Sequence, residues 1–124
     1  MIKRRQVLVV DDELDITLTL KSVLENSGFN VDLFNDPLLA LQNFKTNFYD
    51  LIILDIKMPK MNGFDLYEKI KMIDNKVKVC FLTAWSDFRD YKLSSREFSK
   101  EGGMQLIQKP IENEKLIEQI NTMI

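Results

Sequence analysis

The sequence predicts an α/β fold in which helices cover both faces of a five-stranded parallel sheet. Four apolar runs of strand length recur along the chain, at residues 7–10, 51–54, 79–82 and, less strongly, 104–107. Their apolarity is continuous rather than alternating, which is typical of strands buried on both faces. Stretches with helical spacing separate the runs, so that strand and helix alternate along the chain. This alternation favours parallel strands joined by right-handed crossovers, with helices on both faces of the sheet.

Capping residues bound the first two helices. Residues 26–28 predict a C-cap for the first helix, whose apolar positions are Ile16, Leu20, Val23 and Leu24. Residues 30–34 alternate between apolar and polar side chains, and they predict a strand nearer the edge of the sheet. Asp36 and Pro37 combine an N-cap with a proline at the first helical position. The second helix that they begin is expected to continue through Leu41, Phe44 and Phe48.

The later helices follow the same spacing of apolar side chains. A turn at residues 60–63 precedes the third helix, a more polar stripe marks the fourth, and the last helix closes the sequence. Their apolar positions are Leu66, Tyr67, Ile70 and Ile73 in the third, Phe88, Tyr91 and Phe98 in the fourth, and Leu116, Ile117, Ile120 and Ile124 in the last. We therefore expect a single domain over residues 1–124, with no output domain attached.

Composition excludes several classes of function. A net charge of −2 over 124 residues argues against direct binding of nucleic acid, which needs a basic surface. Because the sequence has neither a membrane span nor a signal peptide, and Cys80 is its single cysteine, we expect a cytoplasmic protein that does not insert into membranes. The absence of histidine removes Ser-His-Asp and Cys-His catalysis and ordinary zinc sites. Any chemistry must use carboxylates, hydroxyls, lysines or a hard cation.

Several polar residues map to the carboxyl edge of the predicted sheet, where open α/β sheets bind ligands. Asp11 and Asp12 end the first strand, Asp55 the third, Thr83 the fourth and Lys109 the fifth. Each has a structural explanation by itself, because an aspartate or a threonine can cap a helix and a lysine can lie on the surface. Three carboxylates at adjacent strand ends repel one another, however, unless a cation lies between them. Oxygen ligands without histidine favour Mg²⁺ or Mn²⁺ over zinc.

These residues belong to a longer pattern with a characteristic order and spacing. The pattern is Asp11-Asp12, Asp55 with Met58-Pro59 and Gly63, Thr83-Ala84 and Lys109-Pro110. It resembles the receiver domain of two-component response regulators, and the resemblance covers essentially the whole chain. A CheY-like receiver implies a flavodoxin-like (βα)5 three-layer sandwich with strand order 2-1-3-4-5.

The resemblance also implies a phosphorylation site. Asp55 would be the phosphoacceptor, and the donor would be the phosphohistidine of a sensor histidine kinase or of a phosphotransfer protein. Asp12, Asp55 and the backbone carbonyl of Lys57 would bind Mg²⁺, with Asp11 acting through a water molecule. The protein would then catalyse only its own phosphorylation and dephosphorylation, and it would not be an enzyme that processes a metabolite.

Further residues of the pattern would surround the phosphoryl group. By resemblance, Thr83 and Lys109 would each contact a phosphoryl oxygen. Ala84 is small enough to leave room for the group, and Pro110 would follow a cis peptide bond.

Three features depart from the usual family pattern. Leu106 stands where receivers usually carry a tyrosine or phenylalanine that turns inward on activation. The segment between Thr83 and Lys109 is longer than is usual. Lys57 and Trp85 occupy the variable positions that flank the site, where side chains affect the access of hydrolytic water.

The hypothesis that follows is a phosphorelay switch that changes its binding to a downstream protein. The face formed by the fourth helix, the strand at 104–107 and the last helix would bind that partner, and could also form a homodimer. A receiver-like interaction module that acts without phosphorylation is the alternative. A haloacid-dehalogenase-type phosphohydrolase would need an aspartate in place of Lys57. A flavodoxin or dinucleotide binder would need a Gly-rich loop after the first strand.

Overall fold

A five-stranded parallel sheet forms the centre of the molecule. The computed structural model describes residues 4–84, 104–109 and 112–124. The strands are β1 (Gln6–Val10), β2 (Asn30–Phe34), β3 (Leu51–Asp55), β4 (Lys78–Thr83) and β5 (Met104–Gln108). All neighbours are parallel, and the order is β2-β1-β3-β4-β5. The predicted fold class and strand order are therefore confirmed.

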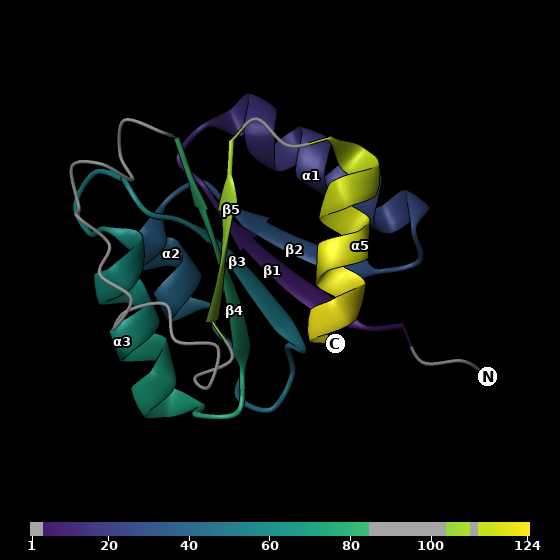
Figure 1. Cartoon of the computed structure of the whole chain (residues 1–124). Coiled ribbons are helices and arrows are strands. Elements are labelled where there is room, and N and C mark those ends of the chain that lie inside the picture. The colour runs from purple at the N-terminus through teal and green to yellow at the C-terminus, as the bar shows by residue number, and fades with distance from the viewer. Residues whose placement is uncertain (1–3, 85–103, 110–111) are drawn as a thin grey trace.

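Helices cover both faces of this sheet (Figure 1). α1 (Leu14–Asn26) and α5 (Asn113–Met123) lie on one face, and α2 (Pro37–Gln42) and α3 (Gly63–Ile73) lie on the other. Alternate residues of each central strand point to opposite faces, so in β3 Ile53 packs towards α1 and α5 while Ile52 packs towards α2 and α3. Two apolar cores result, which explains why the central strands are apolar without interruption.

The first helix and the edge strand agree with the prediction. β2 forms one edge of the sheet, and all of its residues are partly exposed. Ser27 is the C-cap of α1, and Gly28 follows it with a φ of 96°. This left-handed backbone conformation is one that glycine adopts without the steric cost of a Cβ atom.

The second helix is shorter than predicted. α2 ends at residue 42, so Phe44 and Phe48 lie beyond it, and the expected continuation to Phe48 is wrong. Asn43 is the C-cap, and its side-chain N–H donates to a carbonyl of the last helical turn at 2.8 Å. Such bonds offer the backbone an alternative to further helix, and Asn47 then takes a φ of 59°. Both phenylalanine rings pack against Tyr49 in the segment that leads to β3.

The third helix is present as predicted. The apolar face of α3 is buried except for Ile73 at its end, which is 47% exposed. The predicted fourth helix, with Phe88, Tyr91 and Phe98, lies outside the described residues. Along the part of the chain that the structure describes, the helices are too short or too polar to cross a membrane.

Candidate functional site at the carboxyl edge of the sheet

Four polar residues come together where the strands end. Asp11 directly follows β1, Asp55 ends β3, Thr83 ends β4 and Lys109 directly follows β5. Backbone bonds hold these ends in register, since the N–H of Lys109 donates to the carbonyl of Thr83 at 2.7 Å. Side chains that are distant in the sequence are thus placed on one rigid edge.

The Lys109 ammonium is the central cation of this cluster. Its Nζ lies 2.8 Å from Asp11 Oδ2, 3.3 Å from Asp55 Oδ1 and 3.5 Å from Glu13 Oε1. The closest of these contacts is an ion pair rather than a well-aligned hydrogen bond, because Asp11 Oδ2 has no partner with hydrogen-bond geometry. Burial alone would lower the pKa of Lys109, but its contacts with Asp11 and Asp55 outweigh burial and raise that pKa. Lys109 therefore remains charged.

The two buried carboxylates are held at an electrostatic cost. Burial, followed by the neighbouring charge of Asp11, raises the pKa of Asp55 to about 7. Burial also raises the pKa of Asp11, although Lys109 and the backbone N–H of Glu13 oppose that shift. One ammonium thus compensates two buried carboxylates only in part, and a further cation would complete the charge balance.

The oxygen atoms around Asp55 fit such a cation. Carboxylate oxygens of Asp11, Asp12, Glu13 and Asp55 lie within 4.8 Å of one another. Within the described residues, Asp11 Oδ2 is the buried side-chain polar atom that lacks a hydrogen bond, and its ion pair with Lys109 at 2.8 Å partly compensates its charge. Mg²⁺ prefers oxygen ligands and usually keeps several waters, and the exposure of Asp12 and Glu13 allows water to reach the cluster. Lys57 lies two residues beyond Asp55 with an exposed side chain, and its carbonyl stays a predicted ligand.

The loop between β3 and α3 presses closely against Asp55. The N–H of Gly63 donates to the carbonyl of Ile56 at 2.7 Å, which closes the loop at its base. A Cβ atom at position 63 would lie 2.3 Å from the carbonyl oxygen of Asp55, so that a side chain does not fit without a backbone shift. Asn62 caps α3 by accepting a hydrogen bond from the N–H of Asp65 at 2.9 Å. The Asn-Gly pair therefore allows α3 to begin directly beside the site.

The other predicted site residues are placed as follows. Thr83 is fully buried, and its hydroxyl donates to the carbonyl of Ala84 at 3.0 Å. Leu106 is partly buried in β5 and packs on the core beneath α2 and α3. Trp85 and Pro110 lie outside the described residues.

Two neighbouring residues that were not predicted as site residues also contact this edge. The side-chain N–H of Asn35 donates to the carbonyl of Asp11 at 2.8 Å and to Thr17 Oγ1 at 2.9 Å. Asp36 Oδ2 accepts a hydrogen bond from Lys60 Nζ at 2.7 Å. The sequence pattern at Asp36 and Pro37 indicates a helix cap and no further contact. The partners Asp11 and Lys60 are each 24 residues away in the chain, so local patterns carry no signal of these contacts.

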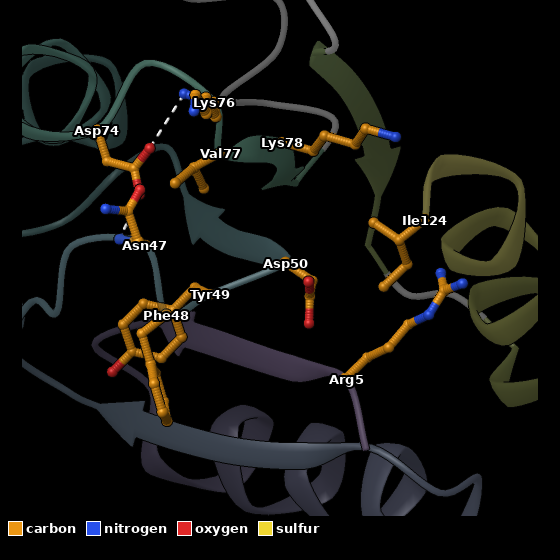
Figure 2. Close-up of a pocket in the computed structure, with 10 residues that line it drawn as sticks. All are labelled: Arg5, Asn47, Phe48, Tyr49, Asp50, Asp74, Lys76, Val77, Lys78 and Ile124. Carbon is orange, nitrogen blue, oxygen red and sulfur yellow. Dashed lines mark hydrogen bonds between the residues drawn. The ribbon is translucent and has the colours of Figure 1, made fainter. Parts of the chain in front are cut away.

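A pocket of about 430 Å³ lies at the opposite edge of the sheet (Figure 2). Charged side chains of both signs line it, namely Arg5, Lys76, Lys78, Asp50 and Asp74. Asp74 already accepts hydrogen bonds from two backbone N–H groups, and Asp50 accepts one. Because its carboxylates are bonded and none of the predicted site residues lines it, the carboxyl edge is the stronger candidate site.

Comparison with protein families and curated proteins agrees with the resemblance seen in the sequence. A family model described as the response regulator receiver domain matches residues 7–121. A transcriptional regulatory protein CpxR homolog from Haemophilus influenzae is 34% identical over 119 residues, and the response regulator ArlR from Staphylococcus aureus is 31% identical over 119 residues. Both alignments cover 96% of this chain, but 50% and 52% of the relatives. The chain thus spans about half the length of these curated relatives.

Solved structures share the fold. A response regulator receiver domain protein from Clostridium thermocellum has a TM-score of 0.79 and 31% identity, with 97% of this chain and 94% of that chain covered. The response regulator protein TrrA from Thermotoga maritima, in complex with Mg²⁺-BeF, has a TM-score of 0.78 and 30% identity, with 97% and 99% covered.

Proposed function

The chain belongs to the response regulator receiver domain family, and we propose that it is a phosphorelay switch with Asp55 as phosphoacceptor. The observation that carries this proposal is the contact between the Lys109 ammonium and two buried carboxylates, Asp11 and Asp55. An anionic nucleophile next to a fixed cation is suited to phosphoryl transfer, which depends mainly on positioning and charge neutralisation. A carboxylate is also a competent nucleophile for an acyl phosphate.

The proposed reaction transfers one phosphoryl group. An oxygen of the Asp55 carboxylate attacks the phosphorus of a phosphohistidine, the P–N bond breaks, and its electron pair leaves with the imidazole of the donor. Lys109 then compensates charge on a phosphoryl oxygen. The Thr83 hydroxyl, which donates to the Ala84 carbonyl at 3.0 Å, would turn to donate to another phosphoryl oxygen.

A divalent cation is part of the proposal. Mg²⁺, or Mn²⁺, held by Asp12, Asp55 and the carbonyl of Lys57, with Asp11 acting through water, would neutralise the phosphoryl charge. The carboxylate oxygens of Asp11, Asp12, Glu13 and Asp55, which lie within 4.8 Å of one another, support this assignment.

The proposed change in partner binding follows from the position of Lys109 directly after β5. A phosphoryl group adds about two negative charges, which would draw Lys109 away from Asp11 and Glu13. β5 precedes Lys109 directly and is joined to α5, since Gln119 Nε2 donates to Gln105 Oε1 at 2.9 Å. We infer that phosphorylation changes the face formed by β5, α5 and the helix predicted before β5. A histidine kinase or phosphotransfer protein would act on the site in the cytoplasm, and a downstream protein or a second copy of the chain would bind the altered face.

Labelling with a small phosphodonor tests this function. We expect acetyl phosphate with Mg²⁺ to attach one phosphoryl group to Asp55, as an acid-stable and base-labile adduct located by peptide mass spectrometry. Asp55→Asn should abolish the label, and chelation of Mg²⁺ should prevent it. A wild-type protein that binds Mg²⁺ and takes up no label would contradict the proposal and favour a module that acts without phosphorylation, for which Leu106 in place of the usual aromatic residue is the supporting observation.

A further inference from the structure

Two adjacent residues at the end of β2 contact both chain segments that would form the metal site. Asn35 donates to the backbone carbonyl of Asp11, which follows β1. Asp36 binds Lys60, which lies in the loop between β3 and α3 that also contains Lys57. These contacts connect the end of β1 with the loop between β3 and α3, two segments that are far apart in the sequence. We call the pair Asn35 and Asp36 the bracket.

The Asp36 carboxylate is well positioned for this contact because its two oxygens have separate partners. Oδ1 accepts hydrogen bonds from the N–H groups of Leu38 at 2.8 Å and Leu39 at 3.3 Å, which caps α2. Oδ2 accepts from Lys60 Nζ at 2.7 Å. The hydrogen bond from Lys60 contributes most to lowering the pKa of Asp36 below its ordinary value. The helix cap therefore fixes an ionised carboxylate that faces Lys60.

Lys60 has a backbone conformation that needs support. Its φ is 70°, in the left-handed region that residues with a Cβ atom avoid. Gly63 closes the base of the loop on Ile56, while the N–H of Met61 donates only to the nearby carbonyl of Pro59. The ion pair with Asp36 is a long-range contact that holds this part of the loop against the β2–α2 turn.

We propose that the bracket is a positioning element of the metal site, which fixes the loop carrying Lys57 relative to the Asp11 end of β1 through the Asp36–Lys60 ion pair. This inference rests on the proposed function, because it concerns the affinity of the same site for Mg²⁺. An ion pair between two exposed side chains commonly contributes little to stability. This pair differs because Asp36 is held by its cap and loses little further freedom on binding Lys60.

The substitution Asp36→Asn removes the ion pair with Lys60 while it keeps the cap of α2. Asparagine keeps one oxygen for the N–H groups of α2, whereas its amide nitrogen cannot accept a hydrogen bond from Lys60. We expect the Kd for Mg²⁺ of the unphosphorylated protein to rise about 2- to 5-fold, measured by isothermal titration calorimetry. Lys60→Gln should give a similar rise, Lys60→Arg should stay near wild type, and the double variant should show no additional loss because both changes break one contact.

Lys45→Gln is the matched control. Lys45 and Lys60 have the same side-chain exposure of 58%, and each pairs with one aspartate, but Lys45 pairs with Asp32 at 3.6 Å on the edge strand. This control removes the same charge and should leave the Kd unchanged. Raising the salt concentration should shrink the ratio of variant to wild-type Kd, since salt screens an exposed pair.

Four outcomes are decisive. Unchanged affinity in Asp36→Asn and Lys60→Gln, or an equal rise in Lys45→Gln, would overturn the bracket while labelling of Asp55 in the wild type leaves the proposed function intact. A raised Kd in both bracket variants without any labelling of the wild type would support the bracket and reject the phosphoacceptor. A wild-type protein that does not bind Mg²⁺ would reject the bracket and the metal site together.

Discussion

A single ammonium group determines the electrostatics of the site at the level of residues. Lys109 lies within 3.5 Å of three carboxylates, and two of these, Asp11 and Asp55, are almost fully buried. A buried carboxylate with a raised pKa resists ionisation. Ionising it at neutral pH without metal therefore lowers the stability of the folded protein. This electrostatic cost falls on Asp55, the proposed nucleophile.

Asp55→Asn should stabilise the protein when metal is absent. The ordinary pKa of the group is 3.8, and in the folded protein burial and Asp11 raise it to about 7. Between these values the folded state binds more protons than the unfolded state, so wild-type stability falls as pH rises through this window, and the loss is complete above it. At pH 8 with a chelator present, we expect the variant to be more stable by about 1–3 kcal/mol in urea unfolding, and the difference should vanish near pH 4.

A charge-matched variant controls this comparison. Glu68→Gln removes one negative charge from an exposed position of α3, and we expect it to show no such pH dependence. Equal stability of wild type and Asp55→Asn across the pH range would mean that Lys109 compensates both buried carboxylates completely.

The loop between β3 and α3 is the element that brings α3 close to Asp55. Its close approach depends on the absence of a side chain at position 63. Gly63→Ala would force the alanine Cβ towards a backbone oxygen at 2.3 Å, which side-chain rotation cannot relieve. We expect a loss of at least about 2 kcal/mol in the free energy of unfolding, together with weaker Mg²⁺ binding, because the carbonyl of Asp55 must move.

Gly28→Ala provides the contrast at another loop. Gly28 has a φ of 96° and no atom within 4 Å of an added Cβ, so its substitution costs backbone strain alone. We expect a loss of about 1 kcal/mol without any change in Mg²⁺ affinity. Similar losses and unchanged Mg²⁺ affinity in both variants would contradict the idea that Gly63 positions the site.

The elements differ in how far the sequence could predict them. β1, β3 and β4 were predictable because burial on both faces leaves a continuous apolar run. The end of α2 was not, since Phe44 and Phe48 fit a helical spacing but their rings pack on Tyr49 outside the helix. An apolar pattern records that a side chain is buried and does not record which element buries it.

The same limit applies to the site. Asp11, Asp55, Thr83 and Lys109 were predictable because each terminates a strand, and parallel strands end at one edge. The contact between Lys60 and Asp36 joins two loops and depends on three-dimensional geometry, which a linear pattern does not encode. The sequence therefore indicates the local role of Asp36 as a helix cap, but it gives no signal for the contact of its second carboxylate oxygen with Lys60.

Across the fold, the sheet separates apolar packing from buried charge. The two apolar cores on its faces carry the packing, while the destabilising charges gather at the carboxyl edge. A ligand that neutralises this edge should therefore stabilise the entire fold, because the strands that end there run through both cores. Binding to the folded state alone raises stability by mass action.

Mg²⁺ should accordingly raise the melting temperature of the unphosphorylated protein. At a free concentration of about 100 times the Kd, binding adds about 2.7 kcal/mol to the free energy of unfolding, which corresponds to roughly 10 °C in Tm for a domain of this size. Asp12→Asn should lose most of this shift because Asp12 contributes an exposed oxygen to the cluster, and calorimetry with and without Mg²⁺ measures it. Asp15→Asn removes the same charge from an exposed position of α1 outside the cluster and should keep the shift. An equal Tm shift in both variants would mean that Mg²⁺ acts on the general negative charge of the protein, since only a specific site distinguishes two exposed aspartates three residues apart.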